Sequence, residues 1–509
     1  MASVTTISAG SGKNEDSGIN HWMSRVVKEL GHLREDVNPD TVHDVRVAVR
    51  RCRSVAEVME EVDPDAGWGE MQKIGRKLFR SLGALRDLQV MKEWVKTLGH
   101  KNDAIRAKLE AVFDKEETEL REAALKDAAK FDAKAWKKLE RVLQRRTRLI
   151  RAGSPAAECI ALERYEEAKE RHARALRGEK PKAWHKLRIG LKHFRYATEN
   201  LLPEHSAAWG ENLKRVQYLL GEIHDLDVLA ERVKQTAEEE QSESRKAWEA
   251  LLQKERHERM QTYRRLTLGK TSLWREWRDG LPHGKKLEAA TSALLRATAR
   301  AMGRRSKNAT LDARIARRLF ESVARSKTGA VFAEAEMRKL FLAASRLYGQ
   351  SAPDDGESSR KAARKFLKKM TLPPGWAGEE WEVVLAAIRY ARGSEPRAKD
   401  KDFGRLSTPQ QEKVRGLAGV LRLARALRKC GVTSCVGLKV EKSAEALIVN
   451  APNLEDTEDA AVQLAAGKHL LESQLDRPLI VKSVPKKDNL FTLPARKDEP
   501  ERASAAASD

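Results

Sequence analysis

Two segments of the chain repeat a pattern of charged residues that suits the binding of anions. Residues 43–53 and 185–195 each present a histidine, an arginine three positions later, a base seven positions later and an arginine ten positions later. At about 100° per residue, these four positions lie within an arc of about 80° on a helix. Arginine contacts phosphate oxygens with two parallel N–H groups, and lysine acts as a point charge. The two stripes consist of His43, Arg46, Arg50 and Arg53, and of His185, Arg188, Lys192 and Arg195.

An apolar stripe lies beside each basic stripe. Its members are Val42, Val45, Val49 and Cys52 in the first segment, and Trp184, Leu187, Leu191 and Phe194 in the second. A solvated charged face lies opposite the apolar face of a helix, so these bases are predicted to border a packing interface. Like charges on neighbouring helix positions cost about 0.2–0.5 kcal/mol each, and partial burial raises that cost. A polyanionic ligand that neutralises the bases is therefore the favoured interpretation.

The alternative is that carboxylates of the chain neutralise the two stripes. Asp44, Asp87 and Asp225 are near enough in sequence to do so in part. They are too few to cancel the bases, and we expect Asp87 and Asp225 to orient bases rather than to catalyse.

A second pair of matching blocks shows that the stripes belong to a duplicated unit. Residues 82–88 read Leu-Gly-Ala-Leu-Arg-Asp-Leu, and residues 220–226 read Leu-Gly-Glu-Ile-His-Asp-Leu. The offset is 185 − 43 = 142 for the stripes and 225 − 87 = 138 for these blocks. Two blocks in the same order indicate a repeated helical unit of about 130–140 residues.

The doubled His-x-x-Arg-x-x-x-basic-x-x-Arg helix, followed each time by Leu-Gly-x-x-(Arg/His)-Asp, resembles the CHAD family (conserved histidine α-helical domain) over about residues 20–265. The resemblance implies two antiparallel helical bundles related by a pseudo-twofold axis. It also implies inorganic polyphosphate as the ligand of a basic central cavity, without enzymatic activity. The residues that match the family's basic positions are His43, Arg46, Arg50, Arg51, Arg53, Arg76, Lys77, Arg80, His185, Arg188, Lys192, His193, Arg195, Lys214 and Arg215. Tyr218 stands where Arg80 would be expected in the second copy.

Residues 310–485 are similar to the C-terminal HD-type region of the exopolyphosphatase/guanosine pentaphosphate phosphatase family. An HD hydrolase holds a divalent metal with a His-Asp pair, further histidines and a distal aspartate. Here Ser345-Arg346 stands in place of the His-Asp pair, Ala391 at a usual histidine position and Arg425 at the distal aspartate. We therefore expect no metal-dependent hydrolysis, and a basic cleft that assists polyanion binding.

The sequence contains no motif typical of a metal or cofactor site. Two isolated signature histidines without cysteines or paired carboxylates make poor metal ligands, and Cys430 and Cys435 have no partner pair for a zinc knuckle. There is no phosphate-binding Gly-x-x-x-x-Gly-Lys-Ser/Thr loop, no His-Glu-x-x-His and no Gly-x-Ser-x-Gly. We expect no catalytic residue, no metal and no cofactor.

The composition of the chain restricts its fold class and its location. The 509 residues include 98 Lys and Arg against 75 Asp and Glu, a net charge of +23, with 41% hydrophobic residues and only 16 prolines. Such a chain is predicted to be mainly α-helical rather than disordered or all-β. It contains no apolar run long enough to span a membrane. The polar first twenty residues and the four cysteines favour a cytoplasmic location.

The pattern along the chain predicts its organisation. We expect a flexible leader (1–19), the duplicated helical domain (20–265), a connector (266–300), a second helical HD-like domain (301–485) and a disordered tail (486–509). Residues 264–285 lose the helical pattern. The second domain is predicted to end in a small α+β segment, with strands at 436–440, 446–449 and 479–484 and a helix at 457–475.

Two rival functions remain open at this level. A nucleic-acid binder would use the same positive charge, although no helix-turn-helix, zinc finger or aromatic RNA-binding motif is present. A phosphohydrolase acting on polyphosphate or a pentaphosphate nucleotide would need the metal ligands that are missing. The favoured partner is inorganic polyphosphate, free or in granules, with nucleic acid as the alternative and no membrane.

Overall fold

The computed structural model describes residues 18–178, 180–236, 243–302, 307–326, 329–348, 365–443 and 445–484. The chain divides into two compact units. The first comprises residues 1–306 and 342–385, and the second comprises residues 307–341 and 386–509. The tail expected at 486–509 and all but the last two residues of the leader expected at 1–19 lie outside the described residues.

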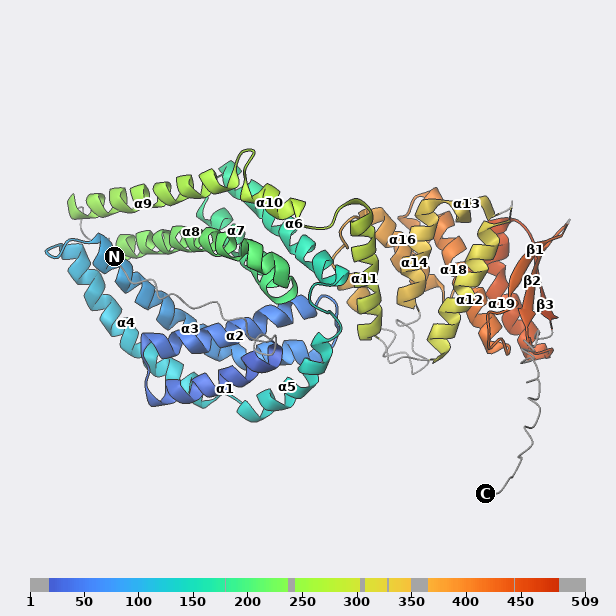
Figure 1. Cartoon of the computed structure of the whole chain (residues 1–509), viewed down its shortest axis with the longest axis horizontal. Helices are drawn as coiled ribbons and strands as arrows, with labels where there is room; N and C mark the ends of the chain where they lie inside the picture. The colour runs from blue at the N-terminus through green and yellow to red at the C-terminus, as the bar shows by residue number, and fades with distance from the viewer. Residues whose placement is uncertain are drawn as a thin grey trace, which may run out of the picture. The chain divides into compact units, whose positions relative to one another are not determined.

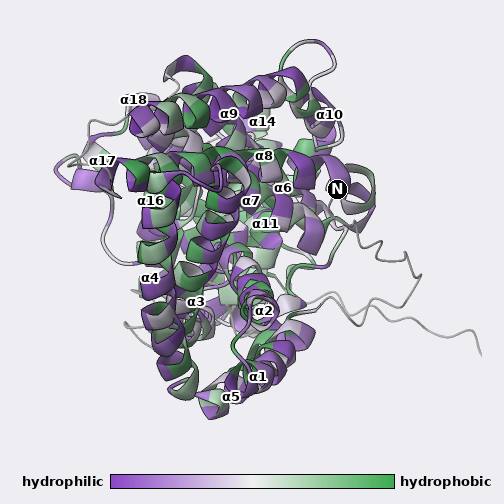
Figure 2. Cartoon of the chain, turned by 90° about the vertical axis from the view of Figure 1, so that its left-hand side faces the viewer, coloured by the Kyte–Doolittle hydropathy of each residue, from purple (hydrophilic) through white to green (hydrophobic). Residues whose placement is uncertain are grey.

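The first unit is built from helices that pack side by side (Figure 1). The helices are α1 (Ile19–Glu35), α2 (Pro39–Met59), α3 (Ala66–Leu98), α4 (Ala104–Ala129), α5 (Ala133–Thr147), α6 (Pro155–Gly178), α7 (Pro181–Leu201), α8 (Pro203–Thr236), α9 (Glu243–Thr267), α10 (Leu273–Asp279) and α11 (Gly284–Met302). Purple, hydrophilic residues predominate on the outer faces of α1, α5 and α9 (Figure 2).

The two basic stripes fall on α2 and α7, which begin in similar ways. Pro39 and Pro181 occupy the first turns, where the missing N–H costs no helical hydrogen bond. Asn38 caps α2 by accepting hydrogen bonds from the N–H groups of Asp40 and Thr41, and the Thr41 hydroxyl accepts from the N–H of Asn38. The apolar stripes predicted beside the bases are buried in both helices.

The helices of the two repeats contact one another. Helix α2 packs on α3 and α7 on α8, and the repeats meet where α2 contacts α7 and α3 contacts α8. Two separate apolar clusters result. Leu85 and Ile223 are the last members of the larger cluster along α3 and α8, whereas Leu88 and Leu226 are the first members of the smaller cluster. The polar pairs of the repeated Leu-Gly blocks therefore lie between the two apolar clusters. These pairs are residues 86–87 and 224–225.

Helix α10 lies in the segment expected to be an irregular connection, so that prediction is wrong at this point. Trp274 and Trp277 of α10 are fully buried, and their rings contact each other edge to face at 5.1 Å between centroids. The indole of Trp274 also contacts Tyr165, whose hydroxyl donates to the Trp274 carbonyl at 2.6 Å. A helix this short has too few residues to show a periodic pattern, and its burial stabilises it instead.

Helices α14 (Ala335–Tyr348) and α16 (Gly378–Tyr390) each contribute residues to both units. The other elements of the second unit are α12 (Lys307–Ala324), α13 (Ala330–Ala333), α17 (Lys401–Gly404), α18 (Thr408–Lys429), β1 (Lys439–Lys442), β2 (Leu447–Pro452), α19 (Glu458–Leu475) and β3 (Leu479–Val484). The sheet order is β1-β2-β3, with β1 antiparallel and β3 parallel to β2.

A mainly helical chain with a small sheet near its C-terminus confirms the coarse fold class. The start of the first strand differs from the prediction: β1 begins at Lys439 rather than at Val436. Gly437 has a φ of +87°, which turns the chain just before the strand. In the ranges that the structure describes, no helix is long and apolar enough to cross a bilayer.

Candidate functional site

Five bases from both repeats interact electrostatically at the contact between α2 and α7. Arg46 and Arg50 of α2 and Arg86 of α3 come from the first repeat, and Arg188 and Lys192 of α7 come from the second. Burial lowers the pKa of Arg46, and the charges of Arg50, Arg86 and Arg188 lower it further. We call these five residues the central basic cluster. Its members come from helices that are far apart in sequence, as the duplication predicts.

Lys192 is the member whose protonation the cluster affects most. Burial, and then the charges of Arg188, Arg50 and Arg46, lower the pKa of its amine to about 8, and the charge of Glu57 opposes the shift. Burial disfavours the charged amine most, and the neighbouring guanidiniums disfavour it further.

Two arginines of the cluster keep donors that are buried and unused. Nη1 of Arg46 and Nε of Arg50 have no hydrogen-bond partner among the described residues. The Arg46 side chain is only 20% exposed, and its Nη2 lies 3.8 Å from Oδ1 of Asp87. An unpaired buried donor costs about 1–3 kcal/mol, so an acceptor that reaches these atoms would bind favourably.

Aromatic rings and one glycine position these guanidiniums. Arg46 lies over Phe79 at 5.6 Å from the ring centroid, and Arg50 lies over Tyr196 at 6.0 Å. At Gly83, in the first Leu-Gly block, a Cβ would come within 2.8 Å of Nη1 of Arg46. The glycine therefore leaves room for the arginine, while the rings hold charged groups without neutralising them.

The pKa values of both signature histidines are lowered. Burial, and next the charge of Arg50, lower the pKa of His43; burial and Arg188 lower that of His185. The ring of His185 lies 4.5 Å from that of His224, whose pKa falls to about 4 through burial and the charge of Arg188. The two rings help to line a cavity of about 590 Å³. A neutral imidazole can still donate one N–H to an anion.

The aspartates of the Leu-Gly blocks lie against the cluster. Burial raises the pKa of Asp225 to about 6 although Arg188 opposes the shift. Asp87 is largely exposed beside Arg46. Both positions suit the predicted role of orienting bases. No group of three or more histidines, cysteines or carboxylates that could hold a metal ion occurs among the described residues.

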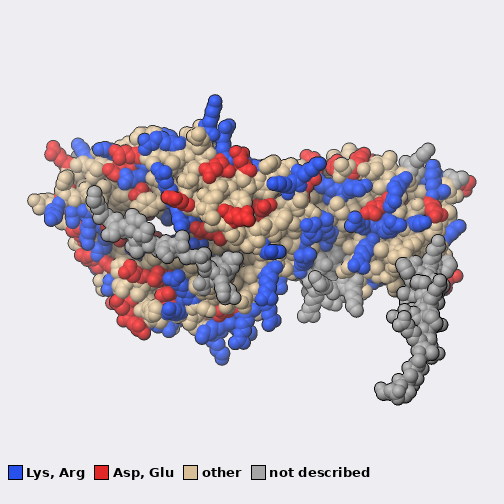
Figure 3. Space-filling view, in the orientation of Figure 1, with Lys and Arg blue, Asp and Glu red and all other residues tan. Residues whose placement is uncertain are grey.

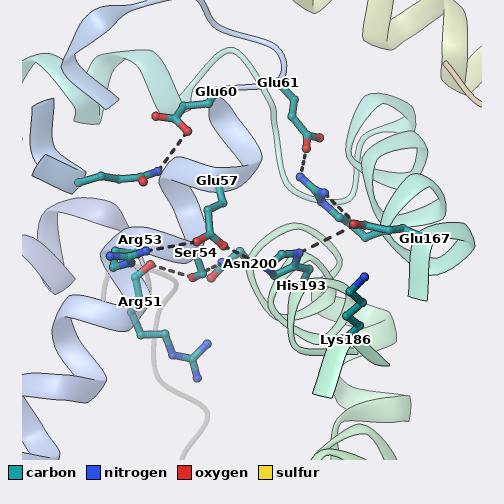
Figure 4. Close-up of polar contacts among 12 residues, drawn as sticks. Arg51, Arg53, Ser54, Glu57, Glu60, Glu61, Glu167, Lys186, His193 and Asn200 are labelled. Carbon is teal, nitrogen blue, oxygen red and sulfur yellow. Dashed lines mark hydrogen bonds and ion pairs between the residues drawn. The ribbon is translucent and has the colours of Figure 1, made fainter. Parts of the chain in front are cut away.

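Four other predicted site residues are engaged by carboxylates of the chain. Arg51 and Arg195 both pair with Glu199, the latter at 2.7 Å. Arg53 of α2 and His193 of α7 both contact Glu57, at 4.0 Å and 3.8 Å, as Figure 4 shows. Figure 4 also shows Asn200, which donates to the hydroxyl of Ser54 at 3.2 Å. The contacts of Arg51 with Glu199, of His193 with Glu57 and of Asn200 with Ser54 join α2 to α7, whereas the other two lie within one helix.

The remaining predicted residues are exposed on α3 and α8. They are Arg76, Lys77, Arg80, Lys214 and Arg215. No hydrogen bond or ion pair joins these five to the central basic cluster in the described part of the chain. Figure 3 shows a further group of bases that the motifs do not include, on the outer face of α5. Its exposed members include Lys134, Lys137, Lys138, Arg141 and Arg145.

Sequence reasoning left two residues out of the candidate site. Arg86 and His224 occupy the same position of the repeated block Leu-Gly-x-x-(Arg/His)-Asp. Both interact electrostatically with the signature helices, Arg86 with Arg46 and His224 with Arg188. Their position within a repeated motif was the signal that could have identified them.

The residues at the substituted HD positions lie in different surroundings. The Ser345 hydroxyl donates to the carbonyl of Leu342 at 3.4 Å, and Nη1 of Arg346 donates to the hydroxyl of Ser292 at 2.7 Å. Ala391 and Arg425 belong to the second unit, where both line one pocket.

Comparison with known proteins assigns part of the chain. Residues 19–234 match the family model of the CHAD domain. Among solved structures, the chain is similar to the CHAD domain from the plant Ricinus communis, at 22% sequence identity and a TM-score of 0.36, over 52% of this chain and 90% of that chain. No curated protein matches the chain. The family predicted from the repeated motifs is thus confirmed for residues 19–234, and the C-terminal region is unassigned.

Proposed function

We propose that the CHAD domain of this chain binds inorganic polyphosphate at the central basic cluster and does so without catalysis. The observation that carries the proposal is the pair of buried, unused donors on Arg46 and Arg50, set among bases of both repeats. Phosphate oxygens supply acceptors and negative charge together. They would satisfy the donors and offset the repulsion that, after burial, lowers the pKa of Lys192.

An extended polyanion fits better than a single phosphate. Arg46, Arg50 and Arg86 belong to one repeat, whereas Arg188 and Lys192 belong to the other. A chain of phosphates can contact both sets at once, and the second contact is then intramolecular. The other predicted bases, including Arg76, Lys77, Arg80, Lys214 and Arg215, would serve a longer chain that extends along the exposed faces of α3 and α8.

We further propose that the two repeats are related by an approximate twofold axis, and that residues 301–485 form a degenerate HD-type domain without its metal ligands. The matched order of α2–α3 and α7–α8 supports the first statement. Ala391 and Arg425 at positions where metal ligands would stand support the second. Both statements agree with binding rather than hydrolysis.

A competition experiment tests the proposal. The full chain, immobilised on long-chain polyphosphate, is challenged with free polyphosphate and with double-stranded DNA of equal charge. We expect polyphosphate to displace the protein at a concentration at least tenfold lower than DNA. The double variant Arg50→Gln/Arg188→Gln should lose about tenfold or more in affinity, since each charge-assisted hydrogen bond contributes about 1.5–3 kcal/mol. The matched control Arg141→Gln/Arg145→Gln removes two exposed charges of α5.

Nucleic acid remains the second candidate ligand, because the exposed bases on α5 could contact a phosphate backbone. In that case DNA would compete as well as polyphosphate, and the α5 variant would weaken binding more than the cluster variant. Phosphate release above a metal-only blank with Mg²⁺ or Mn²⁺ would instead support the phosphohydrolase. Retention of the protein on isolated polyphosphate granules would extend the proposal to that partner.

A further inference from the structure

A cavity of about 590 Å³ opens between the first turns of α7 and the C-terminal half of α8. Its volume lies in the range of about 300–1,000 Å³ that is usual for small-molecule sites. The rings of His185 and His224 meet at its wall, with 4.5 Å between their centroids. The proposed function involves the bases next to this cavity but gives the cavity itself no role.

Neighbouring helices hold the walls of the cavity in place. Arg232 of α8 donates two hydrogen bonds to the carboxylate of Glu116 on α4, at 2.9 and 3.0 Å. Asp227 of α8 accepts a hydrogen bond from Arg256 on α9 at 2.6 Å. Val233, on the opposite face of α8, is fully buried in the smaller apolar cluster. The cavity is therefore built on packed helices rather than on a loop.

The cavity differs from the central basic cluster in charge. Two bases, Lys182 and Arg232, and two carboxylates, Asp227 and Glu231, line it, so their formal charges cancel. Burial lowers the pKa of His224 to about 4, so its ring is uncharged at pH 7. Such a cavity suits an uncharged group with hydrogen-bonding edges rather than a further phosphate.

Helix α7 leads from the cavity to the central basic cluster. His185 lines the cavity, and Arg188 and Lys192 follow it on the same face of the helix. At 1.5 Å per residue, the helix rises about 4.5 Å from His185 to Arg188 and about 10.5 Å to Lys192. After burial, the charges of Arg188 and Lys192 also lower the pKa of both His185 and His224. The bases are thus close enough for one ligand to contact the cavity and the cluster together.

We propose that this cavity binds the nucleoside end of a nucleoside oligophosphate whose phosphates contact Arg188 and Lys192. The inference rests on the proposed function, because it uses bases of the central basic cluster for the phosphates. A flat nucleobase can stack on the imidazole rings, with Pro181 and Val228 supplying apolar contacts. Ribose hydroxyls can donate to the exposed carboxylate of Glu231. An uncharged ring system joined to an anionic tail matches the change in charge from the cavity to the cluster.

The test compares ATP with inorganic triphosphate by titration calorimetry on the full chain in the presence of EDTA. Both compounds carry three phosphates, and ATP carries no more charge than triphosphate, so tighter binding of ATP must come from its nucleoside. We expect ATP to bind at least tenfold more tightly than triphosphate to the wild type. Val228→Trp, which fills the cavity with an indole, should remove this preference and leave the affinity for triphosphate unchanged.

Val142→Trp on α5 is the matched control, because Val142 is exposed to a similar degree, 45% against 38% for Val228, and does not line the cavity. It should keep the preference for ATP. Equal affinities for ATP and triphosphate in the wild type, or a preference for ATP that persists in Val228→Trp, would overturn the proposal. Neither result bears on the polyphosphate site, whose failure would show as undiminished polyphosphate affinity in Arg50→Gln/Arg188→Gln.

Discussion

Replacing Lys192 by methionine should stabilise the ligand-free protein and weaken its binding to polyphosphate. The structure places the Lys192 amine among Arg46, Arg50 and Arg188, where burial and charge lower its pKa from 10.5 to about 8. Each unit of such a shift corresponds to about 1.4 kcal/mol, so the charged amine costs the folded state up to about 3 kcal/mol at pH 7. Methionine has a similar length and no charge. Because the substitution also changes packing, we expect a gain of about 1–3 kcal/mol.

The pH dependence of unfolding gives an independent check of the same reasoning. In the unfolded chain Lys192 keeps a pKa near 10.5, whereas in the folded protein the pKa is about 8. Between these values the unfolded state binds more protons, so stability should rise with pH in that window. The Lys192→Met variant should lose this contribution, and the difference in stability between the two proteins should shrink from pH 8 to pH 10.5.

Urea unfolding of the full chain at low ionic strength and pH 7, monitored by circular dichroism, measures the change in stability that Lys192→Met causes. The transition that long-chain polyphosphate shifts in the wild type identifies the CHAD domain. Its midpoint should be higher in Lys192→Met, and polyphosphate should raise it less than in the wild type. Lys137→Met, on the exposed face of α5, is the control and should leave the midpoint unchanged. An unchanged or lower midpoint in Lys192→Met would refute the claim that the cluster destabilises the empty protein.

Three further outcomes follow from the same site. Asp225→Asn should raise polyphosphate affinity several-fold at pH 7.5, and the affinity should depend less on pH near 6, the pKa of this carboxyl. Fluorescence titrations from pH 5 to pH 8 measure both effects, and a loss of affinity in the variant would contradict the prediction. Arg51→Gln should lower the stability of the CHAD domain by about 1–3 kcal/mol in urea unfolding, because a buried partner of Glu199 is lost, yet change affinity less than Arg50→Gln does. Long-chain polyphosphate should raise the melting temperature more than orthophosphate at equal phosphate concentration, and more so at low salt; equal stabilisation by the two would argue against a site shared by both repeats.

The sequence predicted the helices of the CHAD domain well because its signals are periodic. The bases and apolar residues at spacings of three and four in 43–53 and 185–195 fix both the helix and its buried face. The repeated blocks then show which segments correspond. Residues such as Val45 and Leu187 are buried as the pattern requires.

What the sequence could not supply is the contact between helices from different repeats. Arg50 and Arg51 are neighbours in sequence with the same side-chain type, yet Arg50 keeps an unused buried donor while Arg51 pairs with Glu199 of α7. The packing of α2 on α7 alone decides which arginine meets a carboxylate. Helix α10 was missed for a related reason, because the burial of Trp274 and Trp277 stabilises it rather than a local pattern.

The occurrence of both stripes in one polypeptide has a consequence for how such a site can change over generations. Two identical subunits that faced each other would carry every substitution twice. In a single chain each half varies alone, and here Lys192 corresponds to Arg50 and His224 to Arg86. The second half therefore carries groups with a pKa of about 8 (Lys192) and about 4 (His224) at positions where the first half carries guanidiniums. A single chain thus allows the number of fixed charges and the response to pH to differ between the two halves of the central basic cluster.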